Sequence, residues 1–115
     1  MTNYSFPEIV LVPFPFTDSS TTKKRPVLLL NNSEFSNRTH LIIAGMITSS
    51  LQSPQWPGDY EIKEWKEAGL LNPSKLRLGK IVTLQSSLIL KKLGALSQKE
   101  IPEVIKNIKE VFGLF

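Results

Sequence analysis

The sequence contains no cysteine and only one histidine, His40, and these two shortages narrow the chemistry that the chain can perform. Without cysteine, neither a disulfide nor a thiolate metal site can form. With a single histidine, a Ser-His-Asp arrangement could be built only around His40, and a cluster of histidine ligands could not be built at all. The chain also lacks a Walker loop, a dinucleotide-binding glycine motif and a His-Glu zinc motif. No cofactor is therefore expected.

Long apolar segments are absent as well, because no uninterrupted run of hydrophobic side chains exceeds five residues. A membrane-spanning helix needs about 20 such residues. The N-terminal residues also lack the basic segment and apolar stretch of a signal peptide, so a cytoplasmic protein is expected. A chain of 115 residues, 41% hydrophobic and 21% charged, suits one globular domain that spans residues 1–115.

Charge is distributed unevenly along the chain, which carries 14 basic and 10 acidic residues. Lys23, Lys24 and Arg25 stand together after a segment that holds only two acids. Residues 75–92 contain five basic residues and no acid. Two such basic segments are typical of a surface that binds a polyanion. The net charge of +4, taken alone, fits an ordinary solvated surface better.

Short apolar or alternating segments, bounded by proline, glycine and serine, predict a β-rich fold. The expected strands are residues 9–12, 26–30, 39–48, 59–62, 80–84 and 88–90. Gly45 is expected to form a bulge in the third of them. The basic residues 23–25 are expected to lie in a loop that leads into the second strand. Residues 63–69 suggest one or two helical turns that end at Gly69.

The C-terminal segment predicts an amphipathic helix. Ser97 and Glu100 fit a capping box at its start. Pro102 disfavours the first turn, so the regular helix is expected to begin slightly later. The apolar stripe of the helix has helical spacing and consists of Ile101, Val104, Ile105, Ile108 and Phe112. Short strands followed by one terminal helix predict a mainly β (α+β) fold, in the form of a small curved sheet or barrel.

Arginine, lysine and hydroxyl side chains remain as candidates for chemistry, and this set suits phosphate. Arg25 lies where a polar loop enters an apolar strand, so its guanidinium could contact a phosphate from a rigid base. The alternative is a charge that flanks an apolar strand and limits aggregation. Thr48 and Ser49, at the end of a strand, could donate to a phosphoryl oxygen or could make turns with their own backbone.

Three further residues leave two interpretations open each. Arg77 could be a second phosphate contact, or it could belong to the polar face of an alternating strand. Trp56 and Phe16 lie beside prolines in loops, where an aromatic ring could stack on a base or simply pack. None of these residues decides the function by itself, and their order along the chain is more informative.

Three segments, in this order, resemble the MazF/PemK family of toxins from bacterial toxin–antitoxin pairs. They are Ile9-Val10-Leu11-Val12-Pro13-Phe14-Pro15-Phe16-Thr17-Asp18, Lys24-Arg25-Pro26-Val27-Leu28 and Ile47-Thr48-Ser49. The PemK-like branch is resembled by the later segments Asp59-Tyr60, Trp65-Lys66-Glu67-Ala68-Gly69-Leu70, Leu76-Arg77-Leu78 and Leu93-Gly94-Ala95-Leu96-Ser97. The resemblance runs from about Pro7 to the final helix.

This resemblance implies an SH3-like β-barrel of the MazF/CcdB type with a C-terminal α-helix, assembled as a homodimer. It also implies a metal-independent endoribonuclease, or mRNA interferase, that cleaves single-stranded RNA at short sequences. The nucleophile would be the substrate's own 2′-hydroxyl, and the product would be a 2′,3′-cyclic phosphate. A cognate antitoxin with an acidic tail would neutralise the toxin by covering its basic face.

The resemblance also implies roles for individual residues. Arg25 matches an arginine that serves in acid–base work and phosphate stabilisation, and its electrostatic role is favoured because a guanidinium holds its proton tightly. Thr48 matches a threonine or serine that stabilises the transition state. Arg77 matches a second catalytic arginine of PemK-type toxins. The side chains expected to contact RNA are Lys23, Lys24, Asp18, Ser49 and Lys80.

Two positions depart from the family pattern. Pro7-Glu8 replaces a glycine followed by an acid, which changes a turn. Gly79 stands where this branch often has an aspartate, so cleavage could be slow or could depend wholly on Arg25 and Thr48. Two alternatives therefore stay open: a non-catalytic gyrase poison on the same fold, as in CcdB-type toxins, and a degenerate homologue that binds RNA without cutting it. The intact Arg25 and Thr48 favour the nuclease.

Overall fold

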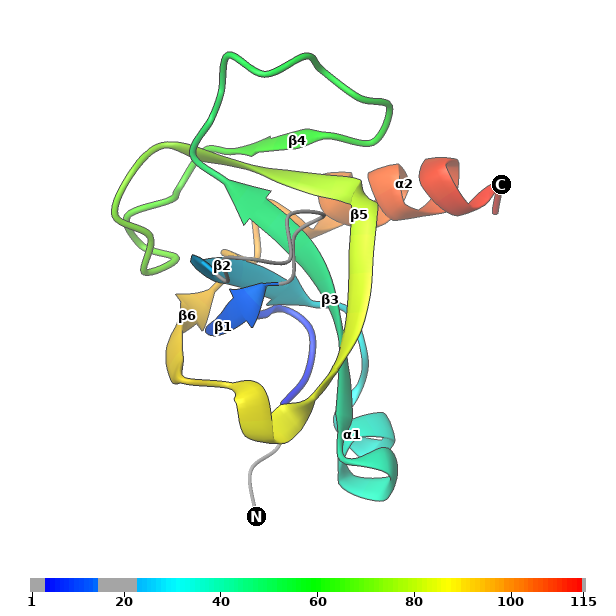
Figure 1. Cartoon of the computed structure of the whole chain (residues 1–115). Coiled ribbons are helices and arrows are strands. Elements are labelled where there is room, and N and C mark those ends of the chain that lie inside the picture. The colour runs from blue at the N-terminus through cyan, green and yellow to red at the C-terminus, as the bar shows by residue number, and fades with distance from the viewer. Residues whose placement is uncertain (1–3, 15–22, 115) are drawn as a thin grey trace.

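The computed structural model describes residues 4–14 and 23–114, which form one curled antiparallel sheet of six strands together with two α-helices (Figure 1). In chain order the elements are β1 (Glu8–Phe14), β2 (Lys23–Leu29), α1 (Ser33–Thr39), β3 (Leu41–Thr48), β4 (Tyr60–Ile62), β5 (Ser74–Gln85), the 3₁₀-helix η1 (Ser86–Leu88), β6 (Lys91–Ala95) and α2 (Ile101–Phe112). The strands lie side by side in the order β4-β5-β3-β2-β1-β6. The sheet curls into half a barrel, so the prediction of a mainly β fold with a C-terminal helix is confirmed.

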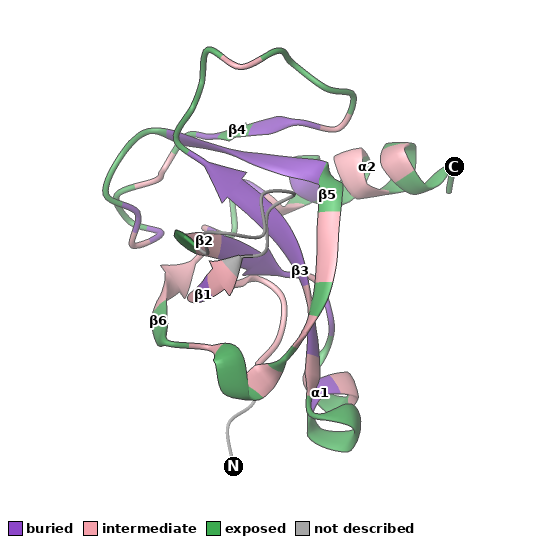
Figure 2. Ribbon diagram, viewed as in Figure 1, coloured by how far each residue is buried: buried purple, intermediate pink, exposed green. Residues whose placement is uncertain are grey.

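Alternation along the strands divides the buried side chains between the two faces of the sheet. Figure 2 marks the buried positions along the ribbon. One face carries the α2-side core, whose buried members are Ile9, Leu28, Ile47, Tyr60, Ile62, Ala68, Leu70, Leu76, Leu78, Leu96 and Val104. The opposite face carries the second core, whose buried members are Val10, Val12, Val27, Leu29, Ile42, Ala44 and Met46. The central strands therefore bury both faces, which explains why their sequences are apolar almost throughout.

The sheet bends along β5, where the pairing with β3 is interrupted. Met46 of β3 pairs with Arg77 of β5. The preceding residue of β3, Gly45, pairs with Ile81, which leaves residues 78–80 of β5 without a partner on β3. The expected irregularity at Gly45 is confirmed, although the additional residues belong to β5. The bulge allows the second half of β5 to turn over the second core (Figure 1).

Two strands are longer than predicted because pairing with neighbours extends them. The basic residues 23–25 lie inside β2 and not in a loop, since β2 pairs with β1 from Lys23 onward. Pro26 is tolerated within this strand because the pairing of β2 with β3 begins only at Val27. β5 begins at Ser74, six residues before the predicted start, and this extension brings Arg77 into the sheet.

Three segments that connect the strands differ in how well they match the sequence predictions. Residues 88–90, predicted as a strand, form the end of η1 and an extended link to β6. The helix α1 was not predicted, because its residues are mostly polar, yet the Asn32 side chain caps it by accepting the Phe35 N–H at 2.9 Å. Residues 63–69 form hydrogen-bonded turns that end, as expected, at Gly69, whose φ is +88°.

The predicted capping box at the start of α2 is wrong. The helix begins at Ile101, and the side chain of Glu100 makes no capping bond to it. Instead the buried Glu100 carboxylate accepts a hydrogen bond from the Tyr60 hydroxyl at 2.6 Å. It also accepts hydrogen bonds from two backbone N–H groups of the 63–69 turns at 2.7 and 3.2 Å. Burial, together with the bond to Glu100, raises the pKa of Tyr60. Glu100 therefore fastens the 63–69 turns and β4 to the foot of α2.

The apolar stripe of α2 is rotated relative to the prediction. Ile105 is 39% exposed and Phe112 is 54% exposed, so these two positions were assigned wrongly. The residues of α2 that do pack in the α2-side core are Ile101, Val104, Ile108 and Val111. None of the helices in the described part of the chain is long and apolar enough to span a membrane.

Candidate functional site

Arg25 and Thr48 lie on the same face of the sheet, near the ends of two neighbouring strands. The outermost recorded pair between β2 and β3 joins Val27 to Met46. Arg25 precedes Val27 by two residues, and Thr48 follows Met46 by two residues, so both side chains point to the face that carries the second core. Arg25 is partly exposed, whereas only 6% of Thr48 is exposed. The strand register thus brings together two residues that lie 23 positions apart in the sequence.

The hydroxyl of Thr48 is held by its own turn. It accepts the Ser50 N–H at 3.1 Å, and a hydroxyl that accepts one hydrogen bond can still donate its own proton. Directly opposite Thr48 on β5 is Lys75, whose side chain is only 3% exposed. The Lys75 ammonium donates to the Ser53 carbonyl at 3.1 Å and lies 3.6 Å from the Asp59 carboxylate.

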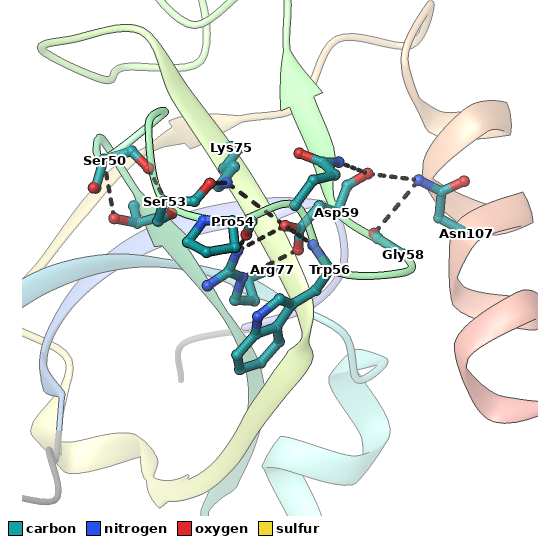
Figure 3. A network of polar contacts seen from close by, with 11 residues as sticks. Ser50, Ser53, Pro54, Trp56, Gly58, Asp59, Lys75, Arg77 and Asn107 are labelled. Carbon is teal, nitrogen blue, oxygen red and sulfur yellow. Dashed lines mark hydrogen bonds and ion pairs between the residues drawn. The ribbon is translucent and has the colours of Figure 1, made fainter.

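Arg77 is the centre of a buried polar network (Figure 3). Its Nε donates to Asp59 Oδ1 at 3.2 Å and its Nη2 donates to Asp59 Oδ2 at 2.8 Å, which makes a forked ion pair. Nη2 also donates to the Pro54 carbonyl, and the Trp56 N–H donates to Asp59 Oδ2 at 2.9 Å. Asp59 and Arg77 are 8% and 7% exposed. The network therefore fastens the loop between β3 and β4 onto β5.

The charge state of Asp59 follows from this network. Burial acts to raise the pKa of the Asp59 carboxyl, because a charged group loses hydration. The hydrogen bonds from Arg77 and from the Trp56 N–H oppose burial, and so do the positive charges of Arg77 and Lys75. Their sum holds the pKa of Asp59 below its ordinary value of 3.8. Asp59 is therefore ionised at neutral pH, and two cations surround one anion beneath the loop.

Trp56 covers the outer side of this network. Its ring centroid lies 4.1 Å from Arg77 Cζ, within the range of a cation–π contact. A Cβ atom at Gly79 would lie 3.0 Å from Trp56 Cε3, so glycine at this position makes room for the indole ring. Arg77 is thus paired with the carboxylate of Asp59, while position 79 carries no carboxylate.

The side chains expected to contact RNA lie in separate places. Lys23 and Lys24 are exposed at the start of β2, next to Arg25 in the strand. Ser49 is exposed directly after Thr48, and Lys80 is exposed on the β5 bulge. Outside the described residues are Asp18 and Phe16.

Asp59 and Lys75 belong to the network, although the sequence assigns neither of them a role in the site. Asp59 lies 18 positions from Arg77, and the sequence identifies it only as the start of a strand and as part of the Asp59-Tyr60 segment that resembles the family. A signal was present in β5, where Lys75 and Arg77 alternate with leucines in a segment that is buried on both faces, because two buried cations require an anion nearby. Within residues 4–14 and 23–114, no group of three or more histidine, aspartate or glutamate side chains is placed to hold a metal ion.

The segments around these residues resemble the MazF/PemK family, and a model of that family matches the chain. The model of the family described as PemK-like, MazF-like toxins of type II toxin–antitoxin systems matches residues 6–112. The chain belongs to this family. Membership accounts for the curled sheet, for the terminal helix and for the ordered segments that contain Arg25, Thr48 and Arg77. No curated protein sequence matches the chain.

Solved structures of toxins share the fold of this family member at low sequence identity. The Mycobacterium tuberculosis toxin MazF-mt6 is 18% identical, with a TM-score of 0.77 over 94% of this chain and 98% of that chain. An endoribonuclease from a mycobacterial species, in complex with its cognate antitoxin, is 14% identical, with a TM-score of 0.76 over 100% of this chain and 98% of that chain. MazE-MazF from Deinococcus radiodurans is 16% identical, with a TM-score of 0.73 over 100% of both chains. Similarity at this level establishes the MazF-type fold alone.

Proposed function

We propose that this toxin is a metal-independent endoribonuclease that cleaves single-stranded RNA through the substrate's 2′-hydroxyl. The observation that carries the proposal is the placement of Arg25 and Thr48 on one face of the sheet, at neighbouring strand ends. Family membership supports the proposal, as does the name endoribonuclease that a structural neighbour bears. The electrostatic needs of phosphodiester cleavage match the groups that these two residues supply.

The reaction is an internal displacement at phosphorus. The 2′-oxygen loses its proton and forms a bond to the adjacent phosphorus, while the bond between phosphorus and the 5′-oxygen of the next nucleotide breaks. The 5′-oxygen leaves with a proton, so the products are a 2′,3′-cyclic phosphate and a free 5′-hydroxyl. Negative charge grows on the phosphoryl oxygens in the transition state, and stabilising this charge is usually the largest contribution to catalysis.

Arg25 and Thr48 divide this task. The Arg25 guanidinium provides a permanent charge and a planar set of donors for the non-bridging oxygens. Thr48 contributes one further donor, because its hydroxyl already accepts the Ser50 N–H and keeps its own proton for the phosphate. Arg77, which the resemblance marks as catalytic, is bound to Asp59, and we assign it a positioning role that also adds positive charge behind Thr48.

Binding of the RNA strand extends this site along the basic face. Lys23 and Lys24 are exposed at the start of β2 and would contact flanking phosphates, with Lys23 on the same face as Arg25 and Lys24 pointing to the opposite side of the strand. Ser49, directly after Thr48, and Lys80, on the β5 bulge, would add further contacts. Assembly as a homodimer belongs to the same proposal. So does inhibition by a cognate antitoxin, whose acidic segment would compete with RNA for the lysines. Support comes from the antitoxin complexes of the mycobacterial and Deinococcus proteins.

The test is cleavage of a long unstructured RNA in excess EDTA, with wild-type protein beside Arg25→Ala. We expect the variant to lose activity by a factor of about 100 or more, the usual cost of removing one transition-state donor. Arg38→Ala is the matched control, because Arg38 is an exposed arginine of α1. Intact RNA with wild-type protein, or equal cleavage by Arg25→Ala, would refute the proposal.

The chemistry of the product ends separates the alternatives. A 2′,3′-cyclic phosphate supports internal attack, whereas a 3′-hydroxyl end excludes it. RNA that is bound but not cut would identify a degenerate homologue. Protein that ignores RNA and inhibits purified DNA gyrase would identify the gyrase poison. Arg25 and Thr48 favour the nuclease, because a gyrase poison does not need a phosphate site at that sheet face.

A further inference from the structure

Trp56 is the large aromatic residue that stands out beside the proposed site. It is 40% exposed, although it lies in a loop whose polar groups are otherwise well bonded. One side of its ring faces the Arg77 guanidinium at 4.1 Å (Figure 3). The ring edge lies over Gly79, where any side chain would crowd it. The cleavage chemistry proposed above does not use this ring.

The loop holds the ring rigidly. The Trp56 N–H donates to the Asp59 carboxylate at 2.9 Å, and the Trp56 carbonyl accepts the Asp59 N–H at 3.0 Å. Asp59 is itself gripped by Arg77 in a forked ion pair. Because backbone and ring are both fixed through the same carboxylate, little conformational freedom remains to be lost when a ligand binds. A ring prepared in this way is suited to stacking.

The arginine on which the ring stacks lies one same-face position along β5 from the residue that pairs with Thr48. Lys75 is paired directly with Thr48, and Arg77 is the next residue of β5 on the same face. Successive side chains on one face of a strand are about 7 Å apart. The ring stacked on Arg77 is therefore about one side-chain spacing from the position level with Thr48. A strand of RNA whose phosphate contacts Thr48 would pass beside it.

We propose that Trp56 is a nucleobase-stacking site, on which an unpaired base next to the cleaved phosphodiester packs against the outer side of the indole. This inference rests on the proposed function and adds a subsite to it. Aromatic rings backed by arginine are common platforms for single-stranded nucleic acid, because every base has a face to stack. Such a site accepts a base only when that base is unstacked, so it selects single strands over duplex RNA.

The charges around the ring favour RNA over a protein partner. Within the buried network beneath the ring, Arg77 and Lys75 carry two positive charges against the one negative charge of Asp59. Residues 75–92 add no acid. Positive charge near the ring attracts the phosphates on either side of a stacked base. Contact of Trp56 with the antitoxin is the competing assignment, and the experiment below separates the two.

The experiment reads the fluorescence of Trp56 directly. Trp65→Phe removes the other tryptophan, which packs against the α2-side core, and leaves Trp56 as the sole indole. The probes are two short oligonucleotides of equal length: a random-sequence 2′-O-methyl RNA, which cannot be cut by internal attack, and an abasic strand with the same phosphates. We expect the first to quench or shift Trp56 emission and the second to leave it unchanged.

Binding constants of ring variants complete the test. Trp56→Ala should weaken binding of the 2′-O-methyl RNA by about tenfold or more and leave binding of the abasic strand unchanged. Trp56→Phe, which keeps a ring over Arg77, should restore part of the loss. Unchanged emission with bound RNA, or equal weakening for both probes, would overturn the stacking site. So would loss of antitoxin binding with RNA binding intact.

Failure of the stacking site and failure of the proposed function are distinguishable. If wild-type protein cuts RNA but Trp56 does not respond to the base-containing probe, only the stacking site is lost. If wild-type protein neither binds the probes nor cuts RNA, the nuclease proposal itself falls, and the stacking site falls with it. The emission measurement uses the native ring, so it does not depend on whether Trp56→Ala folds.

Discussion

The hydroxyl of Thr48 is the smallest group on which the proposed chemistry depends. Thr48→Val keeps the shape of the side chain and removes the donor, so we expect cleavage to fall about a hundredfold. Loss of the bond from the Ser50 N–H should cost stability by only about 1 kcal/mol. Initial rates of RNA cleavage and a urea unfolding curve measure the two effects. Thr48→Ser, which keeps the hydroxyl, is the control. A Thr48→Val variant that cleaves RNA as fast as wild type would contradict the assignment.

Substitutions at Gly79 test whether the absence of a carboxylate two residues after Arg77 limits RNA cleavage, or whether Asp59 serves in its place. A side chain at Gly79 must displace the Trp56 ring, because its Cβ would lie 3.0 Å from Cε3. We expect both Gly79→Ala and Gly79→Asp to lower the free energy of unfolding by no more than about 1 kcal/mol, because the ring shifts by a few tenths of an ångström and its cation–π contact weakens. Neither substitution should speed RNA cleavage. If Gly79→Asp alone raises the rate, the missing carboxylate does limit activity.

Individual residues also show where sequence interpretation reaches its limit. Arg25 and Thr48 become candidates because they lie in segments that resemble the family, and their roles in the site remain predictions. The partner of Arg77 cannot be predicted in this way, since Asp59 comes from a loop whose path depends on the whole sheet. Glu100 illustrates the same limit, because its spacing from Ser97 fits a capping box while its carboxylate serves another segment. Local patterns report local bonds only.

The loop between β3 and β4 depends on a single carboxylate, that of Asp59. Asp59→Asn removes the charge between two buried cations, Arg77 and Lys75, and we expect it to lower the free energy of unfolding by about 3–5 kcal/mol. Denaturant unfolding measures the loss. Glu61→Gln is the matched control, because Glu61 is an exposed acid on neighbouring β4 and should change stability little.

The same carboxylate predicts how stability depends on pH. The folded pKa of Asp59 lies below its ordinary value of 3.8, so the unfolded chain binds the proton more readily than the folded one. The contribution of Asp59 is therefore complete above pH 3.8 and is lost as the pH falls through the lower, folded pKa. Wild type and Asp59→Asn should differ most near neutral pH and converge in strong acid. A difference that does not change with pH would contradict this assignment.

Strands of the sheet can be predicted from the sequence where both of their faces are buried. The cores of β1, β2 and β3 are apolar on both faces, so their existence could be read directly from the sequence. Their ends could not, since β2 reaches back to Lys23 and β5 to Ser74 only because neighbouring strands pair there. The stripe of α2 was rotated for a related reason: both Ile105 and Val111 fit helical spacing, and only packing decides between them.

In the whole molecule, the proposed RNA surface and the helix α2 lie on opposite faces of the sheet. Side chains alternate along β2, so Arg25 faces away from the α2-side core, and α2 covers the opposite face of the sheet. The net charge of +4 says little by itself, because lysines are found on both faces. Position on the fold matters more: the lysines at the start of β2 adjoin the proposed site, whereas those of α2 do not. This difference makes a matched comparison possible.

Salt dependence of RNA binding distinguishes the start of β2 from α2. Each phosphate that a lysine neutralises adds about 0.7 to the slope of log affinity against log salt concentration for single strands. Lys23→Gln combined with Lys24→Gln should therefore weaken binding at low salt and reduce the slope by about 1.4. The control pair, Lys106→Gln with Lys109→Gln, removes the same charge from exposed positions of α2.

Titration of a short, uncleavable 2′-O-methyl RNA at several salt concentrations measures both slopes. The α2 pair should leave the slope unchanged and shift affinity only slightly, because its charges lie on the far face and are screened beyond about 10 Å at 0.1 M salt. Equal losses for both pairs would mean that binding follows net charge and not proximity to Arg25 at the start of β2. A loss confined to the α2 pair would move the RNA surface to the other side of the molecule.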